Sequence, residues 1–87
     1  MTLDELKGKM LHQLLGFVPK ENRSAVTQDT VLKSVLGSEL DGLSPATVFK
    51  QHVQLDCKLA GVKLKRWPEG WVEKTIAELA PKLLPDA

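Results

Sequence analysis

The stretch SPATVFKQHVQLDCKLAG, residues 44–61, decides the fold predicted for this chain. Ser44 is a good N-cap, and Pro45 follows at the first helical position, where its missing N–H group removes no hydrogen bond. Apolar side chains continue at helical spacing as far as Gly61, which closes the segment. They are Val48, Phe49, Val53, Leu55 and Leu59, with His52 on the same stripe. The stretch therefore predicts a central amphipathic helix.

A second amphipathic helix is predicted before this one, over residues 2–15. Apolar residues recur there every three or four positions, Thr2 is a plausible N-cap, and Asp and Glu follow in the first turn. We expect Gly16 to end the helix in a left-handed conformation. Residues 17–30 mix polar residues and proline with little periodicity, which predicts a long loop.

Two further helices complete the predicted fold. A short helical segment fits residues 29–36, and a last helix fits 71–84, where Pro81 should kink the helix or end it early. The short basic stretch 62–68 between the helices fits either an extended or an irregular connection. The pattern predicts an all-α protein, a small bundle of three to four helices.

The composition is typical of a single globular domain over residues 1–87, since this length supports one core. Hydrophobic residues make up 43% and charged residues 26% of the chain, as in ordinary folded proteins. Twelve basic residues against eleven acidic ones leave a net charge of +1, which gives no global field that would favour nucleic acid or an anionic membrane.

The lone cysteine, Cys57, can form no disulfide within the chain, so we expect a reducing cytoplasm. The first ten residues do not resemble a secretory signal, and no apolar run approaches the roughly 18 residues of a membrane span.

We predict no enzyme activity, because no nucleophile is paired with a base in the sequence. Cys57 lies one position off the predicted core face, and His12 and His52 are interpreted as structural or surface residues. The two histidines and the cysteine do not match a zinc spacing, and there is no calcium loop or glycine-rich phosphate cradle. We therefore predict neither a metal site nor a catalytic residue.

Basic and aromatic residues interleave at one place, which contains Lys63, Lys65, Arg66, Trp67 and Trp71. Lys58 precedes it, with no acidic residue between Lys58 and Arg66. Such a pattern can stack bases and neutralise phosphates, or form a protein contact surface. The same pattern also fits a structural explanation, in which the basic residues form a solvated face and at least one indole fills the core.

Five segments, in their order along the chain, resemble one family, the acyl carrier proteins. They are LLG (14–16), VTQDTVL (26–32), VLG (35–37), LDGL (40–43) and KTIAEL (74–79). The resemblance spans roughly residues 3 to 84 and rests on order and spacing, since each fragment alone is weak. It implies a four-helix bundle whose serine carries a phosphopantetheine arm and passes acyl groups to partner enzymes in lipid, polyketide or peptide assembly.

This chain departs from the family at the attachment position. Aligning residues 41–43 with the family's Asp-Ser-Leu places Gly42 where the modified serine belongs, and glycine has no hydroxyl to form the phosphodiester. The resemblance therefore implies a domain without the phosphopantetheine cofactor, unless Ser44 or Ser38 serves as a substitute. Ser44 is also explained as the cap before Pro45.

The charge of the central helix is a second departure, because family members present an acidic helix to basic partners. Here Lys50, His52 and Lys58 stand against Asp56, so steering toward such partners would be weak or inverted.

Three hypotheses follow from these features. The first is a carrier-like domain that acts by recognition of another protein, such as a biosynthetic enzyme. Its predicted contact residues are Lys50, Gln51, Gln54, Lys58, Arg66 and Trp67. The second is a divergent carrier modified on Ser44 or Ser38, and the third is a small nucleic-acid-binding helical domain. The near-neutral charge argues against the third.

Overall fold

In the computed structural model, which describes residues 1–37 and 44–85, the chain begins with helix α1 (Leu3–Leu15). Thr2 and Glu5 form a capping box: the backbone N–H of each donates to the side chain of the other, at 3.2 Å in both cases. The bond from the Thr2 backbone, with a smaller contribution from its hydroxyl, lowers the pKa of Glu5 because it favours the carboxylate. The predicted start of the first helix is confirmed.

The end of α1 differs from the prediction. Gly16 has a right-handed φ of −63°, not a left-handed conformation. The N–H groups of Gly16, Phe17 and Val18 each bond to the carbonyl three residues earlier, so a tighter last turn satisfies these groups without a left-handed residue. The segment predicted as a loop also contains a 3₁₀ helix, η1 (Lys20–Ala25).

Helix α2 (Leu32–Leu36) is shorter than the segment predicted over 29–36 and is followed by Gly37, whose φ of 76° lies in the left-handed region. The N–H of Leu32 donates to the carbonyl of Lys74 at 3.0 Å. An isolated antiparallel bridge joins the neighbouring residues Val31 and Thr75. The start of α2 is therefore tied to the start of the last helix.

Helix α3 (Pro45–Leu59) is the predicted central helix. The hydroxyl of Ser44 accepts a hydrogen bond from the N–H of Thr47 at 3.3 Å, which confirms Ser44 as the N-cap. Gly61, with a φ of 79°, turns the chain away after Ala60.

The buried face of α3 matches the prediction only in part, since Phe49 and Val53 are buried as expected. Its fully buried residues are Ala46, Phe49, Val53 and Cys57, spaced by three and four positions. His52, Leu55 and Leu59, which the sequence placed on the core stripe, are exposed, whereas the thiol predicted to lie beside the core is inside it.

The last predicted helix is divided in two. A 3₁₀ turn, η2 (Trp71–Glu73), precedes α4 (Ile76–Leu83), which starts at a second capping box between Thr75 and Glu78. Pro81 does not end α4, because the exposed proline removes only one N–H donor while Leu79, Ala80 and Leu83 are buried around it.

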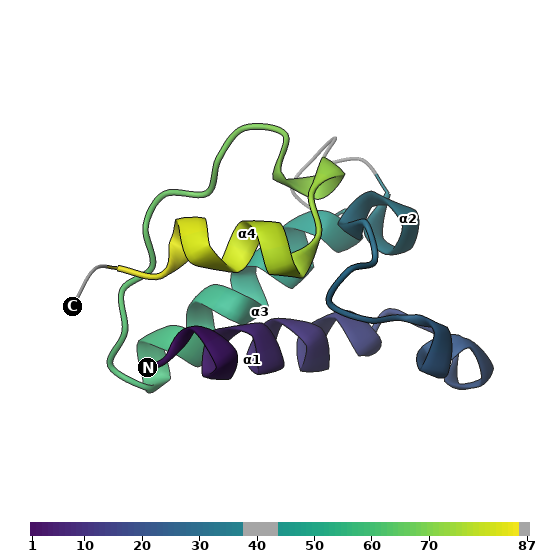
Figure 1. The fold of residues 1–87 in the computed structure, drawn as a ribbon, viewed down its shortest axis with the longest axis horizontal. Coiled ribbons are helices and arrows are strands. Elements are labelled where there is room, and N and C mark those ends of the chain that lie inside the picture. Colours follow the sequence, from purple (N-terminus) through teal and green to yellow (C-terminus); the bar gives the residue numbers. More distant parts are fainter. Residues whose placement is uncertain (38–43, 86–87) are drawn as a thin grey trace.

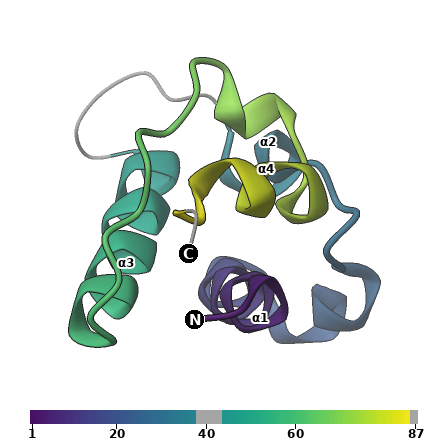
Figure 2. The same ribbon diagram turned by 60° about the vertical axis from the view of Figure 1, so that its left-hand side comes forward.

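The helices enclose one core. Helix α1 packs against α3 and α4, and α2 packs against α3 and η2 (Figure 1). Residues 61–70, called the connecting segment below, run from the end of α3 to η2 without regular structure. Figure 2 shows this segment passing beside α3, and the Lys65 N–H donates to the Leu83 carbonyl at 2.8 Å, which ties the segment to the end of α4.

All buried side chains among residues 1–37 and 44–85 are apolar. The fully buried ones of largest volume are Trp71, Phe49, Leu6, Met10, Leu14, Leu32, Ile76, Leu79 and Leu83. The described part of the chain contains helices and no strand, which confirms the all-α class. The acyl-carrier-like form of this bundle stays a prediction.

Candidate functional site

Of the two serines proposed as attachment points, the structure describes only Ser44. Ser44 is half-buried at the start of α3, where its hydroxyl caps the helix and lies 3.1 Å from the Thr47 hydroxyl. It therefore has a structural role that needs no modification. Ser38 and Gly42 lie outside the described residues.

The residues predicted as partner contacts on α3 are mostly on its outer side. Gln51, Gln54 and Lys58 are exposed. Lys50 is only half-exposed, and its ammonium group lies 5.9 Å from the centre of the Trp67 ring, a cation–π arrangement. The structure therefore gives Lys50 a partner within the chain.

Trp67, predicted as a contact residue, is mostly buried, although it lines a second pocket together with Lys50 and Arg66. Only 6% of it is exposed, because it packs in a cluster with Phe49 and Trp71. Its ring centre lies 6.3 Å from that of Phe49 and 4.8 Å from that of Trp71, both edge to face. Both indoles are core residues, whereas Arg66 beside them is exposed.

Neither indole N–H has a hydrogen-bond acceptor among the described residues. Edge-to-face packing sets the polar edges of aromatic rings against neighbouring ring faces, which offsets part of the cost of burying an unpaired donor. We therefore interpret the cluster of Phe49, Trp67 and Trp71 as part of the hydrophobic core.

Leu55 and Leu59 are functional candidates that the sequence did not reveal. They are 53% and 78% exposed, on successive turns of the outer side of α3. Periodicity assigned them to the core because they continue an apolar pattern. Only the position of α3 against α1 and α2 shows that they face away from it.

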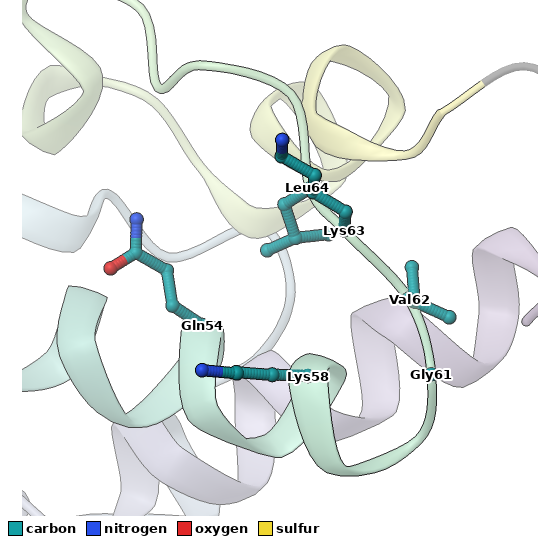
Figure 3. Close-up of a pocket in the computed structure, with 6 residues that line it drawn as sticks. All are labelled: Gln54, Lys58, Gly61, Val62, Lys63 and Leu64. Carbon is teal, nitrogen blue, oxygen red and sulfur yellow. The ribbon is translucent and has the colours of Figure 1, made fainter.

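A groove of about 550 Å³ lies between the second half of α3 and the connecting segment. Gln54 and Lys58 lie on its α3 side, and Val62, Lys63 and Leu64 lie on the other side (Figure 3). Val62 and Leu64 are half-buried, and they pack against the hydrophobic core while lining the groove. We call this groove together with Leu55 and Leu59 the α3 surface.

The α3 surface is basic. Lys58 and Lys63 line the groove with no acidic residue, and the salt bridge found in the described part of the chain joins other residues, Lys33 and Glu73. The nearest acid along α3, Asp56, does not line the groove and accepts a hydrogen bond from Gln13 of α1 at 2.6 Å, so it has a partner within the chain. Both groove lysines are left to solvent or to a partner.

No family model, curated protein or solved structure matches this chain. The helix order has a short α2 between two long helices and a closing α4. The resemblance stays an expectation, so function has to be argued from the chain's own surface.

The residues considered for catalysis lie apart. His12 and His52 are exposed on different helices, and Cys57 is fully buried. Burial raises the pKa of the Cys57 thiol, an effect that Lys9 opposes and Asp56 reinforces. Within residues 1–37 and 44–85, no three His, Cys, Asp or Glu side chains gather as metal ligands. In the same ranges, no helix is long and apolar enough to cross a membrane.

Proposed function

We propose that this chain is a carrier-protein-like recognition domain that is not an enzyme and that binds another protein through the α3 surface. The observation that carries the proposal is the pair of exposed leucines on α3, Leu55 and Leu59, each next in sequence to a residue, Gln54 or Lys58, that lines the basic groove. Isolated exposed leucines are ordinary, but two on adjacent turns next to a concave site favour a protein contact.

The energetics of this surface favour binding. Moving a leucine side chain fully out of water contributes about 1.5–3 kcal/mol. Apolar anchors of this kind, surrounded by polar residues that exclude water, are typical centres of protein interfaces. Gln51, Gln54 and Lys58 would supply such a surrounding on α3.

We further propose that recognition occurs without a phosphopantetheine arm. Gly42 supplies no hydroxyl at the family's attachment position, and the Ser44 hydroxyl caps α3. Intact mass after incubation with coenzyme A and a phosphopantetheinyl transferase tests this: we expect no change. A gain equal to one phosphopantetheine group, mapped to Ser44 or Ser38, would support the divergent carrier instead.

Nucleic acid is a weaker candidate ligand. Proteins that bind single strands stack bases on exposed aromatic side chains. Trp67 and Trp71 are 6% and 1% exposed, so the tryptophans beside the basic residues offer no such platform.

The proposal is tested by capturing partners with the wild-type chain and with a Leu55→Gln, Leu59→Gln variant. Glutamine keeps helix propensity and adds no charge, so the variant changes only the apolar character of the surface. The matched control is Val31→Gln, which alters another exposed apolar residue, 42% exposed, at the start of α2. We expect a partner that is retained by the control and lost by the double variant; equal retention by all three would contradict the proposal.

A further inference from the structure

We propose that the partner element bound at the α3 surface is an acidic amphipathic helix. This inference rests on the proposed function and specifies the chemistry of the partner. It joins two observations, the one-turn spacing of Leu55 and Leu59 and the basic charge of the groove that the neighbouring residues Gln54 and Lys58 line.

The spacing favours a helical partner. Leu55 and Leu59 are four residues apart on α3, so they lie about 6 Å apart along its axis. An amphipathic helix carries apolar side chains every three or four residues, which is the same interval. It can therefore lie along Leu55 and Leu59 and contact both. Apolar anchors from the partner would then enter the groove, where Val62 and Leu64 line the side opposite α3.

The charges favour an acidic partner. Lys58 and Lys63 line the groove, Arg66 is exposed further along the connecting segment, and no acidic side chain lines the groove. A basic helix would place like charges against these groups, whereas carboxylates flanking the apolar anchors would meet them. This charge complementarity would accelerate association and select the partner more than it would add affinity.

The test uses two synthetic peptides of roughly 18 residues, long enough to form a helix. Both carry leucines at the same helical spacing; the remaining charged positions are glutamate in one and lysine in the other. Each is titrated into the ¹⁵N-labelled full chain, with fluorescence anisotropy for affinity and amide shifts for location. We expect the glutamate peptide to bind, with shifts concentrated over residues 51–66, and the lysine peptide not to bind.

Charge variants then test the complementarity. Replacing two rim charges by Lys58→Glu and Lys63→Glu should weaken binding of the glutamate peptide by about tenfold and flatten its salt dependence. The matched control, Lys7→Glu with Lys20→Glu, makes the same change in net charge on α1 and η1 and should leave affinity within about twofold.

Several results would overturn the inference. They are equal or tighter binding of the lysine peptide, no binding of either peptide, amide shifts outside the α3 surface, tighter binding of single-stranded DNA, or sedimentation showing that a second copy of the chain covers this surface. A partner whose capture depends on Leu55 and Leu59 but whose bound segment is not acidic would uphold the proposed function and refute this inference. The two failures are therefore distinguishable.

Discussion

Replacing Phe49 by alanine should remove a large part of the stability of this fold. Phe49 is fully buried, and its ring centre lies 6.5 Å from Phe17, 6.3 Å from Trp67 and 5.9 Å from Trp71. A buried Phe→Ala substitution costs about 3–5 kcal/mol. A chain of 87 residues has a total free energy of unfolding of about 4–13 kcal/mol, so the loss is at least about a fifth of it.

The assay is urea unfolding followed by tryptophan fluorescence, which reports directly on the affected cluster because Trp67 and Trp71 are the two tryptophans of the chain. With an m value of about 1–2 kcal/mol/M, the midpoint should fall by at least about 1.5 M. Leu59→Ala is the matched control, because it lies on the same helix but is 78% exposed. Its free energy of unfolding should change by no more than about 0.5 kcal/mol.

Two outcomes would refute this reasoning. A loss below about 1 kcal/mol for Phe49→Ala would mean that the aromatic cluster is not packed as a core. A loss for Leu59→Ala as large as that for Phe49→Ala would mean that the outer face of α3 is buried in solution.

Three further predictions concern stability. Gly70→Ala should cost about 1–2 kcal/mol because φ is 72° there, whereas Gly8→Ala, in the open interior of α1, should stabilise the fold by about 0.5–1 kcal/mol; thermal unfolding of the pair checks both signs. Thr75→Ala, which removes the cap of α4, should cost about 1 kcal/mol in urea unfolding, and no loss would contradict the capping geometry. Burial raises the pKa of Cys57 in the fold above its ordinary 9.0. The stability from this group is therefore fully present below pH 9 and is lost as the pH rises from 9 through the folded pKa. Cys57→Ala should flatten that alkaline decline in stability, and an unchanged slope would contradict this prediction.

Local signals allowed the sequence to predict the starts of α1 and α3. Thr2 with Glu5 and Ser44 with Pro45 satisfy the first N–H groups of a helix by contacts within a few residues, and such contacts do not depend on the rest of the fold. The second capping box, at Thr75, was in the sequence too. Its signal could have separated α4 from η2, but the apolar pattern from Trp71 onward concealed the break.

The faces of the helices depend on tertiary packing, which periodicity alone does not define. In α3 the apolar residues can be grouped into two stripes, one with Val53 and Cys57 and one with Leu55 and Leu59. The sequence correctly placed Phe49 and Val53 on the core stripe but added Leu55 and Leu59, whereas the core contains Ala46 and Cys57 instead. The same limit placed Trp67 among the partner contacts, since a basic neighbourhood says nothing about where an indole points.

The candidate site could be predicted only in part, because the sequence did not show which apolar residues of α3 face solvent. Lys58, Gln51 and Gln54 were found because polar residues on an amphipathic helix face solvent. Leu55, Leu59 and the groove were missed, because the groove forms only when the connecting segment passes beside α3.

The measurement that tests the central claim most directly is the affinity of a captured partner for the wild type, for Leu55→Gln with Leu59→Gln, and for Val31→Gln, each by titration calorimetry. Loss of about 1–2 kcal/mol per buried leucine predicts at least roughly tenfold weaker binding by the double variant. The Val31 control should bind as the wild type does. Equal affinity of all three proteins would contradict recognition through the α3 surface.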